Sequence, residues 1–228
     1  MSEADRITPE LFTFLEDLRD NNERAWFESN RARYEREVRE PLLEFTAALQ
    51  EPLAAISPSI LAIPKKQGGS LFRIHRDIRF SKDKSPYKTW AALQFRHEAA
   101  KNVHAPGFYL HFEPGNVLAA AGIWRPAKPE LDAVRQAMDE DPDGWTGVRG
   151  AVEAAGWKFG GESLKRVPRG YESEHALADE LKLKDYIVSV PLTEKQVCSP
   201  GFLDEYVDLC RAAAPLPAYL CGVLGLAW

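Results

Sequence analysis

Apolar and polar positions in the first fifty residues follow the spacing of an α-helix. Thr8, Pro9 and Glu10 form a typical helix start, and they precede apolar residues three and four positions apart at 11, 14, 15 and 18. A second run from Trp26 to Leu49 has the same period. This part of the chain therefore predicts a short amphipathic helix followed by a long one, bent near Pro41.

The period changes from helical spacing to two in the middle of the chain. Between residues 72 and 80, apolar Phe72, Ile74, Ile78 and Phe80 alternate with charged or polar side chains, which predicts a half-buried strand. Further strands are expected over 90–96, 108–113 and 117–124, and Pro114-Gly115-Asn116 supplies turn residues between the last two. Consecutive strands with short connections favour a mainly antiparallel sheet.

Helical periodicity returns in the last hundred residues. It appears over 129–139, 145–155 and 175–183, before a strand pattern over 185–191 and a helix that Ser199-Pro200 would start and that would end near 213. The final apolar segment, 218–228, is too short to cross a bilayer and is expected to pack on the core. The whole pattern predicts a single α+β domain over residues 1–228, with an antiparallel sheet in the middle flanked by N-terminal and C-terminal helices.

Charge and cysteine content narrow the classes of protein that this chain can be. The net charge of −5 and the pI near 5.6 argue against a protein that coats nucleic acid or an anionic membrane through its overall field, so any anion binding is expected from a local patch. The chain has no leader-like N-terminus and no apolar run of membrane-spanning length, so we expect no membrane association. Its three cysteines, all in the last 31 residues, do not form a disulfide framework. These features predict a soluble, cytoplasmic protein.

One segment contrasts with this acidic background. Between residues 73 and 88 the chain carries six cationic side chains against Asp77 and Asp83, a local excess of four positive charges. Arginine forks bind phosphate or carboxylate in bidentate fashion, and lysines add mobile point charges. On a strand, Arg73, His75, Asp77 and Arg79 would share one face and could form the floor of a cleft, with residues 81–88 as its rim. The segment is therefore a candidate anion-binding site.

Each residue of this candidate site has an expected role. His75 and Asp77 are the only nearby pair that could transfer a proton, and Tyr87 could stack on a base or sugar. Arg76, on the apolar face, is expected to be a buried charge paired with a carboxylate or with backbone carbonyls. The expected anion-binding residues are Arg73, Arg79, Lys82, Lys84, Tyr87 and Lys88, with Lys165, Arg166 and Arg169 as a second side of the cleft.

Three blocks of sequence carry a resemblance to a known family. The central block is Leu71-Phe72-Arg73-Ile74-His75-Arg76-Asp77-Ile78-Arg79-Phe80-Ser81-Lys82-Asp83-Lys84-Ser85-Pro86-Tyr87-Lys88. It resembles the signature of the family called domain of unknown function 2461. Residues 21–27 are similar to the family's early helix block, and residues 164–171 to its late basic block. The resemblance spans nearly the whole chain, and the family name implies no activity, substrate or cofactor.

Three functions remain open at this point. The preferred one is a binding or catalytic site for a phosphorylated or carboxylated ligand at residues 73–88. The alternatives are a nucleic-acid-binding module that uses the same patch, and a scaffold or protein-interaction domain without ligand chemistry. No cofactor and no metal site are predicted; His75, Asp77 and His111 would be the least improbable metal ligands by residue chemistry. The oligomeric state is left open, as is the question of whether the protein is an enzyme.

Overall fold

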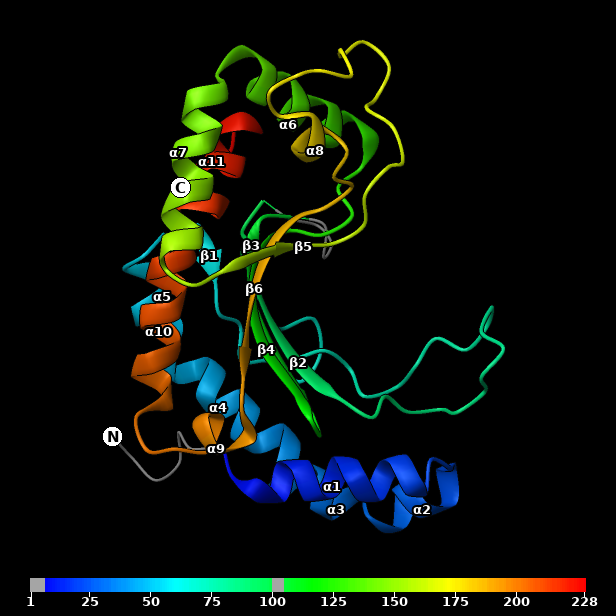
Figure 1. Cartoon of the computed structure of the whole chain (residues 1–228). Helices are drawn as coiled ribbons and strands as arrows, with labels where there is room; N and C mark the ends of the chain where they lie inside the picture. The colour runs from blue at the N-terminus through cyan, green and yellow to red at the C-terminus, as the bar shows by residue number, and fades with distance from the viewer. Residues whose placement is uncertain (1–6, 100–104) are drawn as a thin grey trace.

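The computed structural model describes residues 7–99 and 105–228 and has the expected α+β architecture. A single antiparallel sheet of six strands lies at its centre, in the order β1-β2-β3-β4-β6-β5 (Figure 1). The strands are β1 (Ile60–Leu61), β2 (Ala91–His97), β3 (Gly107–Glu113), β4 (Asn116–Ile123), β5 (Lys158–Gly160) and β6 (Tyr186–Leu192). Four of the predicted strands are thereby confirmed as β2, β3, β4 and β6, and the short edge strands β1 and β5 are additions.

The N-terminal helices are more broken than the sequence pattern indicates. They are α1 (Pro9–Asp20), α2 (Arg24–Ser29), α3 (Arg31–Tyr34), α4 (Glu40–Ala48) and α5 (Gln50–Ala54). A π-helical turn over Glu35–Arg39 separates α3 from α4, so the predicted long helix is interrupted where its hydrogen bonds change register. Pro41 lies just after this π-helical turn, inside a continuous helical run, where it has no N–H to donate to the preceding turn.

Six further helices follow the hairpin of β3 and β4. They are α6 (Lys128–Glu140), α7 (Pro142–Ala154), α8 (Ala178–Leu181), α9 (Glu194–Val197), α10 (Phe202–Ala213) and α11 (Pro215–Val223). The predicted helix over 175–183 is wrong except for the single turn of α8. The start of α10 is also corrected, because Gly201, with a φ of 92°, precedes its first residue in place of Ser199-Pro200. No helix among the described residues is long and apolar enough to cross a bilayer.

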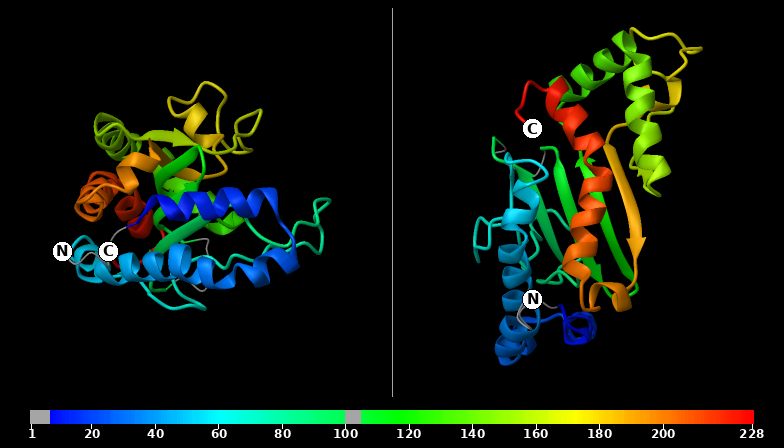
Figure 2. Two further views of the ribbon diagram at one scale, coloured as in Figure 1. Left: turned by 90° about the horizontal axis from the view of Figure 1, so that it is seen from below. Right: turned by 90° about the vertical axis from the view of Figure 1, so that its left-hand side faces the viewer.

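The two faces of the sheet differ in what covers them. Leu93, Leu110 and Ala119 are aligned across β2, β3 and β4, and all three are buried against the helical layer. Helices α10 and α11 pack against β4 on this side (Figure 2). On the other face, Tyr109 and Ala120 are only partly buried. Because the helices gather on one side, side chains that carry chemistry can collect on the other.

The predicted strand over residues 72–80 is wrong, and the edge of the sheet explains why. Leu71 bridges to Leu93, and the Phe72 N–H donates to the Ala92 carbonyl, so the chain follows β2 only up to this point. Since β2 begins at Ala91, the next residues have no strand to pair with. They leave the sheet as an irregular projection, seen in Figure 1 as the long loop that extends away from the body. We call residues 76–86 the arm.

Candidate functional site

The root of the arm is fixed to the N-terminal helices. Two backbone hydrogen bonds join its legs, from the Arg76 N–H to the Pro86 carbonyl (2.9 Å) and from the Lys88 N–H to the Ile74 carbonyl (2.8 Å). Tyr87 is 3% exposed and stacks on Phe27, with ring centroids 4.1 Å apart. The expectation that Tyr87 stacks on a base or sugar is therefore corrected, because its ring is part of the core.

Within the arm, the acidic residues bind the arginines. Asp77 accepts a bidentate hydrogen bond from Arg79 (2.9 and 2.6 Å), and this bond lowers the pKa of Asp77 to about 2. Arg76 pairs with Asp83. The predicted carboxylate partner of Arg76 is thus present, but the prediction of burial is wrong, since the Arg76 side chain is 27% exposed.

The remaining arm cations face solvent. The Lys84 ammonium donates to the Ile78 carbonyl (3.0 Å). Lys82 makes no hydrogen bond or ion pair within residues 7–99 and 105–228. None of Arg79, Lys82 and Lys84 lines either of the two cavities beside the root.

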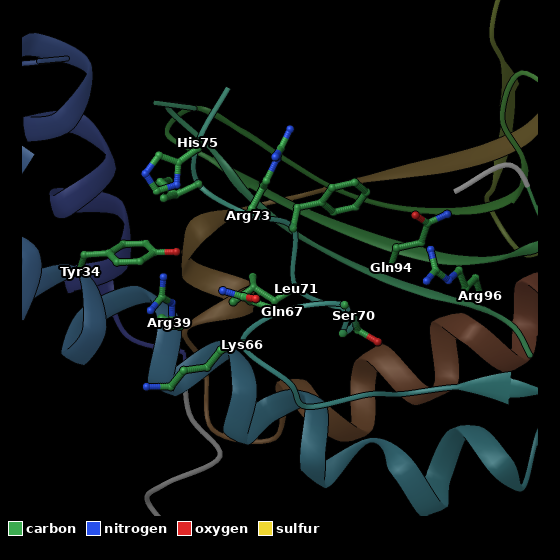
Figure 3. A pocket seen from close by; sticks show the side chains of 14 residues that line it. Tyr34, Arg39, Lys66, Gln67, Ser70, Leu71, Arg73, His75, Gln94 and Arg96 are labelled. Carbon is green, nitrogen blue, oxygen red and sulfur yellow. The ribbon is translucent and has the colours of Figure 1, made fainter. Parts of the chain in front are cut away.

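A cavity of about 690 Å³ lies beside the root of the arm, and we call it the arginine cavity (Figure 3). It is bounded by the helical region around the π-helical turn, by the loop that follows β1, by the start of the central block (residues 71–88) and by β2. In Figure 3, Tyr34 and Arg39 lie at one end, and Gln94 and Arg96 lie at the other. Its lining consists of Tyr34, Arg39, Lys66, Gln67, Gly68, Gly69, Ser70, Leu71, Phe72, Arg73, Ile74, His75, Gln94 and Arg96.

The cations of this cavity outnumber the carboxylates that reach them. Arg39 pairs with Glu35 in the π-helical turn, and the Lys66 ammonium lies 3.6 Å from the same carboxylate. The guanidiniums of Arg73 and Arg96 have neither a hydrogen bond nor an ion pair to any residue that the structure describes. Among the described residues, the one carboxylate of Glu35 thus contacts two of these four cationic side chains and no carboxylate contacts the other two, which leaves the cavity positively charged.

His75 is the one titratable side chain on this wall that could change its charge near neutral pH. Burial lowers its pKa from the ordinary value of 6.5, and the positive charges of Arg31 and Arg73 lower it further. The imidazole is therefore neutral at pH 7, and an anion placed in the cavity would favour its protonated form.

Lys88 lies at the junction between the arm and the sheet. Its ammonium donates to the Arg73 carbonyl (2.7 Å) and lies 5.2 Å and 4.7 Å from the ring centroids of Phe72 and Trp90. The rings and the carbonyl favour the charged form, whereas burial and the charge of Arg73 oppose it. The pKa of Lys88 is lowered to about 8.

A second cavity, of about 580 Å³, is lined by Lys88, Asp77 and Glu113 among others. His75 and Asp77 therefore belong to different cavities, and the predicted proton-transfer pair is not assembled. Glu113 ends a hydrogen-bonded chain in which His111 Nε2 lies 3.3 Å from the carboxylate, and the Tyr109 hydroxyl lies 2.8 Å from His111 Nδ1. Within the described residues, no three His, Cys, Asp or Glu side chains are placed to hold a metal ion.

The second predicted side of the cleft is also displaced. Lys165, Arg166 and Arg169 are exposed on the loop between β5 and α8, which Figure 1 shows well away from the arm. Sequence reasoning missed Arg39, Lys66 and Arg96. Of these three, only Lys66 could have been suspected from the sequence. It lies in a turn-forming segment, Lys65-Lys66 before Gly68-Gly69, just ahead of the central block (residues 71–88).

The fold and cavity define an α+β protein with an antiparallel sheet, one helix-covered face and a basic cavity at the sheet edge. Its family is established by comparison. The model of the family described as conserved hypothetical protein (DUF2461) matches residues 10–219, so the chain belongs to that family. The comparisons with curated proteins and with solved structures gave no match.

Proposed function

We propose that the arginine cavity binds a phosphorylated or carboxylated ligand. The observation that carries the proposal is that Arg73 and Arg96 line the cavity without a carboxylate partner in the part of the chain that the structure describes. A guanidinium forms its strongest hydrogen bonds with carboxylate or phosphate oxygens, and two unpaired ones on one cavity offer such bonds to a ligand.

The shape of the cavity supports a ligand of moderate size. Its volume falls within the range of about 300–1,000 Å³ that is usual for ligand pockets. Arg39 and Arg96 lie at opposite ends (Figure 3), so an elongated ligand with anionic groups at two places would be bound best. Gln67 adds a neutral hydrogen-bonding side chain to the lining.

Ligand-induced shifts in melting temperature test this proposal. The panel would contain inorganic phosphate, pyrophosphate, sugar bisphosphates, nucleotides and dicarboxylates, because a ligand that binds only the folded state raises the melting temperature. We expect a shift with at least one phosphate-bearing compound, and a smaller shift in Arg73→Gln and in Arg96→Gln. Arg79→Gln is the matched control, since Arg79 lies on the arm and outside the cavity. If no compound shifts the wild type, or if Arg79→Gln loses the shift equally, the proposal is wrong.

A further inference from the structure

A projecting aromatic side chain marks a second candidate surface, separate from the arginine cavity. Phe80 is 95% exposed, the most exposed large hydrophobic residue of the described chain. It belongs to the arm, whose two legs are joined by the ion pair of Arg76 with Asp83 and by the hydrogen bond from the Lys84 ammonium to the Ile78 carbonyl. The Arg79 guanidinium lies 5.9 Å from the centroid of the Phe80 ring. The arm therefore presents an aromatic face beside a cation.

The arm has an excess of positive charge although the chain is acidic. Residues 76–86 contain four lysines and arginines and two aspartates, a net charge of +2, whereas the whole chain carries −5. Both aspartates are bonded to arginines of the arm. Lys82 and Lys84 are therefore the cations of the arm that have no carboxylate partner among the described residues.

We infer that the arm contacts single-stranded nucleic acid, with a base stacked on Phe80 and with phosphates bound by Lys82 and Lys84. Stacking needs only an exposed ring, because every base has a π-face, and nearby cations neutralise the backbone. The chemistry of the arm favours this partner over a protein surface. Protein interfaces are depleted in lysine and surround their aromatic anchors with apolar contacts, whereas the neighbours of Phe80 in sequence are Arg79, Ser81 and Lys82.

The inference does not depend on the ligand of the arginine cavity. The anion-binding groups of that cavity, Arg73 and Arg96, are not on the arm, and Lys82 and Lys84 do not line the cavity. A wild-type protein that binds phosphate but no oligonucleotide would overturn this inference alone. A wild-type protein that binds oligonucleotide but no small anion would overturn the proposed function alone.

Fluorescence anisotropy with a labelled single strand of about 20 nucleotides tests the inference directly. The full chain should bind at about 50 mM salt and more weakly at about 200 mM. Phe80→Ala should weaken binding roughly 5- to 150-fold, because stacking of a base on one ring contributes about 1–3 kcal/mol. Phe80→Tyr should restore most of the binding, because it keeps an aromatic ring. Replacing Lys82 and Lys84 together by Gln should reduce the slope of log affinity against log salt by about 1.4, which corresponds to two phosphate contacts on a single strand.

A control variant comes from the other exposed aromatic residue. Trp124 is 48% exposed and follows β4 at the end of the sheet opposite the start of β2, where the arm is attached. Trp124→Ala should therefore leave binding unchanged. The inference is overturned if the wild type does not bind at low salt, or if Phe80→Ala and Trp124→Ala behave alike. It is also overturned if Phe80 is instead required for self-association or for binding to vesicles of anionic lipid, with no effect on oligonucleotide binding.

Discussion

Tyr87 and Phe27 stack with their ring centroids 4.1 Å apart and their planes inclined by 21°. The pair joins residues that are sixty positions apart in the sequence, one in α2 and one at the root of the arm. Asn22 strengthens the same junction, because its amide donates to the Tyr87 carbonyl and accepts from the Tyr87 N–H, both at 3.0 Å. Residues 21–27 therefore fix the position of the central block (residues 71–88). The start of that block forms one wall of the arginine cavity.

Removal of the Tyr87 ring should destabilise the whole protein. Tyr87→Ala leaves a hole beside Phe27 and is expected to cost about 3–5 kcal/mol of unfolding free energy. Tyr87→Phe keeps the stacked ring and should cost less than about 1 kcal/mol. Urea denaturation followed by tryptophan fluorescence measures both variants. Equal stability of Tyr87→Ala and wild type would show that the junction is not formed in solution.

Anion binding to the arginine cavity should depend on pH through His75. The pKa of free His75 is below 6.5 because of burial and nearby arginines, and a bound anion should raise it. Affinity should therefore increase as the pH falls through this pKa, since protonation accompanies binding.

The His75 titration can be followed by the NMR shifts of its imidazole with and without phosphate. His75→Gln should remove the part of the pH dependence that comes from the imidazole and leave the part that comes from the phosphate group of the ligand, whose second pKa is about 6. Binding at pH 7 should be kept, because the imidazole is already neutral there. An unchanged pKa of His75 at saturating phosphate would argue against an anion near this side chain.

Lys88 should titrate well below an ordinary lysine. Its folded-state pKa is about 8, against an ordinary value of 10.5. Between these two values the unfolded chain binds more protons than the folded protein, so the contribution of Lys88 to stability rises as the pH increases across this window. Lys88→Met should remove that rise, which urea titrations at pH 8 and near pH 10 can measure.

The same lysine offers a second measurement. NMR of ¹³C-methylated lysines should show one resonance with a midpoint near 8. Arg73→Gln should move this midpoint upward, because the charge of Arg73 contributes to lowering it. A midpoint for Lys88 near 10.5 would mean that the rings and the carbonyl outweigh its burial.

The sheet could be predicted from the sequence because its strands have clear period-two patterns and short connections. Residues 108–113 and 117–124 are adjacent in both sequence and space, and local turn residues determine how they pair. Residues 72–80 show the same alternation, but Phe80 is exposed. An alternating pattern shows that a segment can form a strand. The strand forms only where a neighbouring strand can pair with it, and β2 begins at Ala91 and does not extend alongside these residues.

The site was only partly predictable, for a related reason. Arg73 and His75 were selected because they lie in a dense basic block, and they do line the arginine cavity. Arg39 and Arg96 come from a helix and a strand in which single arginines are common, so nothing local distinguishes them. Conversely, Arg79 belongs to the same central block as Arg73, but its guanidinium forms an ion pair with Asp77. Which cations lack a carboxylate partner depends on tertiary contacts that spacing alone does not encode.

A crystal structure of the protein with the phosphate-bearing ligand that gives the largest melting shift would locate the bound anion. Its anionic group should lie in the arginine cavity, within about 2.7–2.9 Å of the guanidinium nitrogens of Arg73 or Arg96. A ligand bound elsewhere, with both guanidiniums paired to carboxylates of the protein itself, would contradict the proposed function.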